Sequence, residues 1–188
     1  MPKYIAFVSS LMIIVYPFAV YWGVSSLGIG CSALIIACFF LLRFFFPPVS
    51  HNVSNYIRAI RVLAAAGIAL AILSWAMHDT QWFRYYPVAV NLIFLVLFGY
   101  SLIRPPSMIE RFARLKNPDL PDSGVNYTRR VTGIWCVFFL CNGLAAFYTA
   151  AAAAFEVWVL YNGLISYLLI GALLAGEYCF RTYCLKRY

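Results

Sequence analysis

Long apolar runs separated by short polar intervals make up most of the chain. A membrane-spanning helix needs roughly 20 mostly apolar residues, and about 17 to 25 are tolerated. Six stretches meet that requirement: residues 4–23, 29–46, 57–77, 86–103, 128–153 and 157–178. The pattern predicts an all-α, polytopic membrane protein whose six transmembrane helices form a single domain over residues 1–188.

The longest polar interval, residues 104–130, contains an amphipathic segment at residues 107–116. As a helix it would carry apolar side chains on one face and charged ones on the other: Met108, Ile109, Phe112 and Leu115 against Glu110, Arg111 and Arg114. Ser107 and Glu110 have the spacing of a capping box, which predicts where this helix begins. We expect the helix to lie flat on the inner leaflet, with a docking surface for a cytoplasmic partner or an anionic head group as the alternative.

Composition agrees with a membrane location. Hydrophobic residues make up 64% of the chain and charged residues 11%, which leaves too little polar surface for a soluble domain. The net charge of +8 is explained by where Lys and Arg fall. With six spans, thirteen of the fourteen basic residues lie on one side and Arg84 lies alone on the other. The positive-inside rule then places both termini and the long polar interval in the cytoplasm, and no nucleic-acid partner is expected.

Six arginines are candidates for binding lipid phosphate or a partner protein: Arg58, Arg61, Arg111, Arg114, Arg129 and Arg130. The first two and the last two begin outward-going helices, where the helix dipole disfavours a cation. Some other interaction must therefore favour them. Attraction to an anionic membrane surface, at roughly 1 kcal/mol per basic residue, is sufficient, and a specific phosphate site is the sharper alternative.

Few polar residues lie within the spans, and Asn91, Asn142 and Asn162 stand out among them. Hydrogen bonds between helices account for such residues, and an intramembrane path for a substrate is the alternative. Small residues four apart, as in Gly171 and Ala175, let helix backbones approach closely. Such small residues would also allow the helices to associate with a second copy of the chain or with another membrane protein.

The sequence predicts no catalytic residue, no metal site and no cofactor. His78 and Asp79 form the one His–acid neighbour pair, and no catalytic triad, P-loop or glycine-rich nucleotide motif is present. The six cysteines match neither zinc-site spacing nor a secreted disulfide framework, so we expect small core-filling side chains.

The second half of the chain resembles a known family. The resemblance rests on a Pro-x-x-Ile-Glu-Arg start and on a series of later motifs: Leu120-Pro121, Arg129-Arg130, Trp135-Cys136-Val137-Phe138-Phe139, Asn142-Gly143-Leu144-Ala145 and Trp158-Val159. These resemble an uncharacterised family of bacterial inner-membrane proteins whose genes accompany aryl-polyene or xanthomonadin-type pigment genes. More distantly, the same order of motifs is similar to the intracellular septation protein A family.

The resemblance implies a bacterial inner membrane and an envelope-lipid or polyene context, and it supplies no catalytic residue. We expect a non-enzymatic accessory protein of envelope or aryl-polyene lipid assembly, whose partners are membrane lipids and biosynthetic proteins. A small lipid or metabolite transporter that uses the three asparagines is the alternative. A membrane-bound acyl-transfer enzyme comes third.

Overall fold

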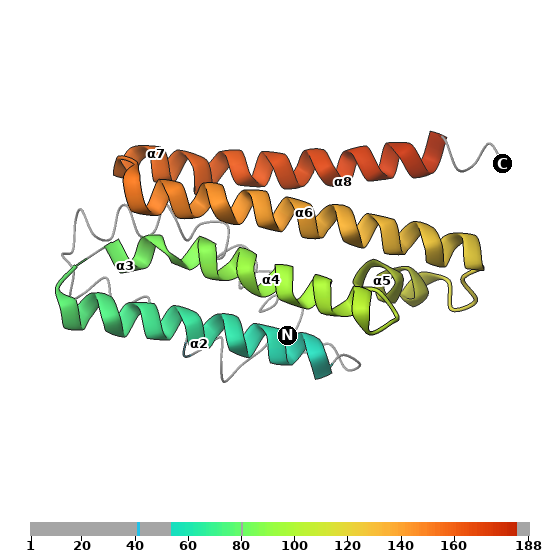
Figure 1. Cartoon of the computed structure of the whole chain (residues 1–188), viewed down its shortest axis with the longest axis horizontal. Helices are drawn as coiled ribbons and strands as arrows, with labels where there is room; N and C mark the ends of the chain where they lie inside the picture. Colours follow the sequence, from blue (N-terminus) through green and yellow to red (C-terminus); the bar gives the residue numbers. More distant parts are fainter. Residues whose placement is uncertain (1–40, 42–53, 80, 184–188) are drawn as a thin grey trace, which may run out of the picture. The chain divides into compact units, whose positions relative to one another are not determined.

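Helices account for all the regular structure in the residues that the computed structural model describes, which are 41, 54–79 and 81–183. Figure 1 shows their course. In chain order they are α2 (Ser54–Met77), α3 (Gln81–Arg84), α4 (Tyr86–Ile103), α5 (Met108–Lys116), α6 (Asp122–Ala152), α7 (Phe155–Leu160), the π-helical η1 (Tyr161–Ile165) and α8 (Ser166–Tyr183). The all-α prediction is confirmed for this part of the chain. The predicted spans 4–23 and 29–46 lie outside the described residues.

Three of the described helical segments are long and apolar enough to cross a membrane: Gln81–Ile103, Asp122–Ala152 and Phe155–Thr182. They correspond to the last three of the six predicted spans. The predicted span 57–77 falls within α2, but the apolar helix recognised there, Arg61–Met77, is shorter than the other three. The described residues therefore provide three candidate spans and do not support six.

In two places the observed helices differ from the predicted spans. α6 begins at Asp122 rather than at residue 128, because a carboxylate in the first turn suits the positive end of the helix dipole and Pro121 accepts a hydrogen bond from Val125. The predicted continuous helix 157–178 begins at Phe155 and is interrupted by the π-helical turn η1.

The chain divides into two compact units, Met1–Val90 with Ala146–Ile165, and Asn91–Ala145 with Ser166–Tyr188. In the described part of the first unit, α2, α3, the start of α4, the end of α6 and α7 share one core. Its buried residues are Ala64, Ala71, Phe83, Tyr86, Ala150 and Trp158. Three of these residues are alanine and three are aromatic, so the helices approach closely and large rings fill the remaining space.

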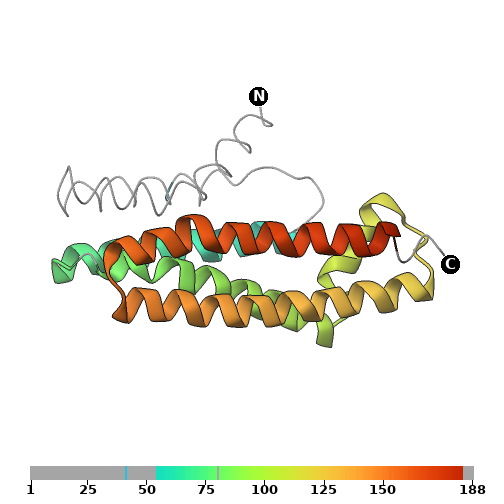
Figure 2. The same cartoon turned by 90° about the horizontal axis from the view of Figure 1, so that it is seen from above.

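The core of the second unit is built from aromatic rings of α4 and α6. The Phe139 ring lies 5.3 Å from that of Phe94 and 5.1 Å from that of Phe98, and Trp135 completes the cluster. Such ring pairs add about 0.5–1.5 kcal/mol beyond the area that they bury. α8 runs beside α6 within this unit (Figures 1 and 2), where Tyr127 donates a hydrogen bond to Glu177 over 3.2 Å.

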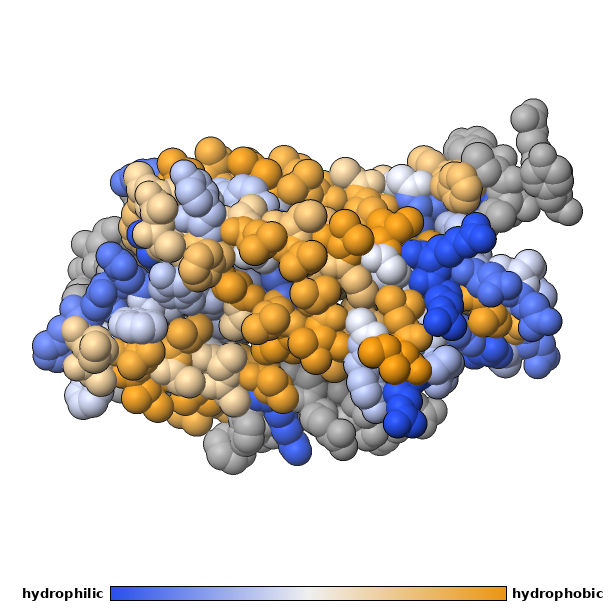
Figure 3. Space-filling model, in the orientation of Figure 1, coloured by the Kyte–Doolittle hydropathy of each residue, from blue (hydrophilic) through white to orange (hydrophobic). Residues whose placement is uncertain are grey.

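Large apolar side chains cover the outward faces of the long helices. On α6 the exposed ones include Ile134, Val137, Leu140 and Leu144. Hydrophobic residues dominate the middle of the visible surface, and hydrophilic residues gather toward both sides of the view in Figure 3, including the region of α5. An apolar surface of this extent matches a lipid environment, because water would oppose its exposure.

Candidate functional site

The site lies in the second unit, where α5 docks against α4 and α6. Two hydroxyl groups accept hydrogen bonds from the first backbone N–H groups of α5. Met108 donates to Ser101 Oγ over 2.9 Å, and Ile109 donates to Thr132 Oγ1 over 3.3 Å. The first N–H groups of a helix have no partner within the helix, so these hydroxyls both satisfy them and hold α5 in place.

Glu110 forms the glutamate half of the predicted capping box. Its Oε2 accepts a hydrogen bond from the backbone N–H of Ser107 over 3.2 Å. The sequence placed Glu110 on the charged face of the helix, but the residue is only 5% exposed. Burial is tolerated because Arg114 pairs with Oε1 at 2.9 Å, so the carboxylate is neutralised by a neighbour on its own helix.

The apolar face of α5 is divided. Met108 and Ile109 pack on the aromatic core of the second unit. Phe112 and Leu115 are exposed, by 53% and 74%. α5 therefore has an anchored first turn and an exposed apolar second turn, and its position against a leaflet stays a prediction.

Four of the six candidate arginines lie in the second unit, and they divide into two kinds. Arg111 donates to the carbonyl of Pro106 over 2.8 Å, and Arg114 donates to the carbonyl of Pro118 over 2.9 Å in addition to pairing with Glu110. These two side chains therefore connect α5 by hydrogen bonds to the loops on either side of it. Arg129 and Arg130 are exposed and make no hydrogen bond or ion pair with any residue that the structure describes.

The other two arginines belong to the first unit. Arg61 is exposed, and the side chain of Arg58 lies outside the described residues. The second unit therefore contains Arg111, Arg114, Arg129 and Arg130, and the first unit contains Arg58 and Arg61.

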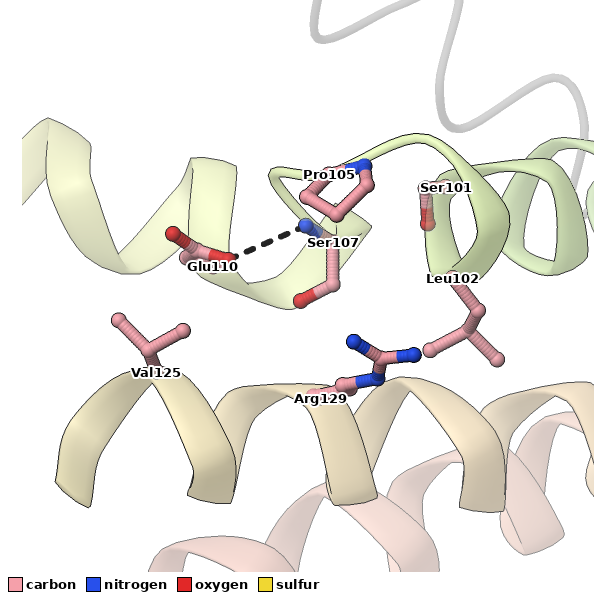
Figure 4. A pocket seen from close by; sticks show the side chains of 7 residues that line it. All are labelled: Ser101, Leu102, Pro105, Ser107, Glu110, Val125 and Arg129. Atoms are coloured by element: carbon pink, nitrogen blue, oxygen red, sulfur yellow. Dashed lines mark hydrogen bonds between the residues drawn. The ribbon is translucent and has the colours of Figure 1, made fainter. Parts of the chain in front are cut away.

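A small pocket of about 100 Å³ opens between α4, α5 and α6 in the second unit. Figure 4 shows the side chains around it, which come from Ser101, Leu102, Pro105, Ser107, Glu110, Val125 and Arg129. Ser107 is 3% exposed, and its Oγ has no hydrogen-bond partner among the described residues. The Arg129 guanidinium extends from α6 toward Ser107 (Figure 4). The pocket therefore combines a cation, a carboxylate and a buried hydroxyl that lacks a partner.

Asn91 and Asn142 meet in the second unit. Asn142 Nδ2 donates to Asn91 Oδ1 over 3.0 Å and to Ser166 Oγ over 2.9 Å, and all three residues are buried. These bonds link α4, α6 and α8. The interpretation of the asparagines as interhelical hydrogen-bonding groups thus describes this pair, and a substrate path stays a prediction.

Asn162 lies in the first unit, within η1. Its Nδ2 donates to Thr149 Oγ1 over 3.2 Å and to the carbonyl of Trp158 over 3.0 Å. In a π-helical turn each backbone N–H bonds to the carbonyl five residues back instead of four. The Asn162 amide supplies a second donor to the carbonyl four residues back, and it ties the turn to α6.

Ser101 and Thr132 have site roles that the sequence did not reveal. Each is a single hydroxyl residue within an apolar run. A hydroxyl in that position commonly bonds to a preceding carbonyl of its own helix, so the sequence gives no sign of a further partner. Both make such a bond as well, Ser101 to Phe98 and Thr132 to Thr128. Only the docking of α5 gives them a second partner.

The described residues contain no group of three His, Cys, Asp or Glu side chains arranged to hold a metal ion. Comparison of the chain with protein families, with characterised proteins and with solved structures finds no match.

Proposed function

We propose that this protein is a non-enzymatic accessory protein of the bacterial inner membrane, acting in cell-envelope or aryl-polyene lipid assembly. Its basic surface, formed by Arg111, Arg114, Arg129 and Arg130, meets lipid phosphate or a biosynthetic partner on the cytoplasmic side. In this proposal the chain crosses the membrane six times and both termini are cytoplasmic. The biological context comes from the family resemblance of its second half.

One observation carries the proposal: Arg129 and Arg130 are exposed and have no partner within the described residues. A guanidinium without a protein partner retains all five of its N–H donors for an external oxyanion. Two such groups are adjacent on the first half of α6, where the polar interval passes into an apolar run.

The exposed second turn of α5 supports the same orientation. Phe112 and Leu115 would insert among acyl chains while the arginines reach the phosphate level. Each basic residue near an anionic surface contributes about 1 kcal/mol, so the arginine pair favours this side of the bilayer for the α5 end.

The proposal is tested by deleting the gene in the bacterial host and measuring envelope lipids and polyenes in extracts by mass spectrometry. We expect altered amounts of these products, restored by the wild-type gene and not by Arg129→Ala/Arg130→Ala. Lys186→Ala/Arg187→Ala is the control, because it removes the same charge from another cytoplasmic segment of the proposed topology. Unchanged products after deletion, or full restoration by the first double variant, would refute the proposal.

A lipid or metabolite transporter is the second candidate function, and the buried Asn91, Asn142 and Ser166 cluster favours it. Intramembrane polar residues mark substrate pathways in many transporters. In vesicles loaded with radiolabelled bacterial metabolites, a transporter would lose flux in Asn142→Leu while Arg129→Ala/Arg130→Ala retained it. The accessory role predicts no flux that depends on Asn142.

A further inference from the structure

We propose that the pocket between α4, α5 and α6 binds the aminoethyl phosphate head group of a phospholipid, with the phosphate on Arg129 and the ammonium on Glu110 and Ser107. This inference rests on the proposed function and specifies its ligand: a zwitterionic head group with N–H donors rather than phosphate-bearing lipid in general.

The anionic half of the ligand is matched by Arg129. This side chain lines the pocket, and it forms no ion pair with Glu110 or any other described residue. Arg130, the next residue along α6, is also exposed and without a described partner, but it does not line the pocket. The chain therefore contains a matched pair of arginines of which only one belongs to the pocket.

The cationic half is matched by two acceptors. The Oγ of Ser107 is buried without a partner, which costs free energy unless a ligand or water supplies a hydrogen bond. The Glu110 carboxylate accepts one hydrogen bond on each oxygen, from Ser107 and from Arg114. A carboxylate has about four acceptor sites, so it can accept a further N–H from a primary ammonium, which has three to offer.

The size of the pocket limits the ligand. A cavity needs about 10–15 Å³ to hold a single water molecule. A pocket of about 100 Å³ therefore admits a group of several heavy atoms. It is too small for a segment of a folded partner. A phosphate with a short amine fits this range.

A membrane lipid is a better match than a free metabolite because of the surroundings. Leu102 and Val125 provide apolar wall on two sides of the pocket. Ile103, the last residue of the candidate span that includes α4, is 77% exposed. A head group bound here would keep its glycerol and acyl chains beside apolar side chains, whereas a soluble phosphoamine would leave those side chains in water.

Two related head groups fit less well. A trimethylammonium cannot donate hydrogen bonds and is normally held by aromatic rings. The pocket lining contains no aromatic residue. A glycerol head group carries no positive charge to pair with Glu110, so it gains less from a buried carboxylate.

Native mass spectrometry of the detergent-solubilised full chain tests the inference, with dioleoyl phosphatidylethanolamine, phosphatidylcholine and phosphatidylglycerol added separately. For the first bound lipid we expect phosphatidylethanolamine to bind about tenfold more tightly than the other two, as expected for charge-assisted hydrogen bonds gained at one site. Arg129→Ala should weaken binding of the first lipid for all three head groups, because they share the phosphate, whereas Arg130→Ala should leave that binding unchanged. Free phosphoethanolamine should compete only weakly, and competition equal to that of the lipid would assign the pocket to a soluble ligand.

The outcomes separate this inference from the proposed function. Equal affinity for all three lipids in the wild type would overturn the inference and leave general phosphate binding intact. Equal losses in the two arginine variants would also overturn it, because only Arg129 lines the pocket. Absence of any bound phospholipid would overturn lipid-phosphate binding as a whole. The wild-type comparison of lipids needs no substitution, so a variant that fails to fold cannot obscure the answer.

Discussion

Arg84 is the basic residue that the sequence isolates from all the others, and in the first unit its guanidinium closes the carboxyl-terminal end of α6. Nη2 donates to the carbonyls of Thr149 and Ala153 over 2.5 and 2.6 Å. The guanidinium also lies 5.8 Å from the centre of the Phe155 ring. A cation at this end of a helix is favoured by the dipole and satisfies carbonyls that have no partner in the helix. The indole N–H of Trp158 in turn donates a hydrogen bond to the backbone carbonyl of Arg84 over 2.9 Å.

Arg84→Met should therefore destabilise the protein, because the carbonyls at the end of α6 lose a charged donor. We expect the free energy of unfolding to fall by about 2 kcal/mol, the usual contribution of hydrogen bonds to a charged group. Denaturant unfolding of the detergent-solubilised protein, monitored by circular dichroism, measures this change in the free energy of unfolding. Arg130→Met is the matched control and should change stability by less than about 0.5 kcal/mol, as is usual for surface positions. Equal effects of the two substitutions would show that Arg84 acts only as a charge.

At the scale of elements, the approach of α4 and α6 in the second unit depends on the absence of a side chain at one position. A Cβ atom added to Gly143 would lie 3.2 Å from Cβ of Asn91. Asn91 also accepts the hydrogen bond from Asn142, so the two helices meet through Asn91 of α4 and the neighbouring residues Asn142 and Gly143 of α6. Close backbone approach at small residues is the general way in which membrane helices pack.

Gly143→Leu is expected to separate α4 from α6 and lower the free energy of unfolding by about 1–3 kcal/mol, the cost of overpacking a well-filled contact. Gly133→Leu is the control on the same helix, because a Cβ there would meet nothing within 4 Å. Denaturant unfolding of both variants gives the comparison. A similar loss at Gly133 would indicate that glycine itself, rather than the contact with Asn91, sets the stability.

The docking of α5 makes a second prediction at this scale. Thr132→Val removes the acceptor for the Ile109 amide and keeps the shape of the side chain. We expect hydrogen exchange at Ile109 and its neighbours in α5 to be about fivefold faster, because losing one hydrogen bond costs about 1 kcal/mol of local stability. Thr128→Val is the control, since its hydroxyl bonds to Val125 within α6. Unchanged exchange in Thr132→Val would mean that the apolar contacts of Met108 and Ile109 hold α5 without it.

At the scale of the whole molecule, charged segments precede two of the candidate spans along the described chain. The candidate spans ending at Ile103 and beginning at Asp122 flank α5 with Arg111 and Arg114, and Arg129 and Arg130 lie near the start of the second of these spans. The turn between α2 and α3 contains His78 and Asp79 instead. The proposed topology places these two regions on opposite sides of the membrane, with the basic one in the cytoplasm.

Cysteine labelling tests this arrangement in a variant whose native cysteines are replaced by alanine. Asn117→Cys should react with a membrane-impermeant maleimide in inverted membrane vesicles and not in intact spheroplasts, and Gln81→Cys should show the reverse. With the native Cys141 restored, this exposed residue of α6 should remain unlabelled in both preparations, because lipid covers it. Labelling of positions 117 and 81 from the same side would contradict the topology.

The sequence by itself determined the helical class, the three candidate spans in the described region and the start of α5, because apolar run length and the Ser107–Glu110 spacing are local properties. The early start of α6 was missed although its signals, Pro121 and Asp122, are local. The π-helical turn could not be determined, because the amide of Asn162 bonds to Thr149 on another helix.

The composition of the candidate site was decided by tertiary structure. Arg111 and Arg129 look alike in the sequence, yet one braces a loop carbonyl and the other lines the pocket without a partner. Glu110 reads as a surface residue, yet it is buried beside Arg114. Hydropathy and helical period specify which face a residue occupies on its own helix. Which group meets that face depends on how distant helices pack, and that packing buries Glu110 and brings Arg129 to the pocket.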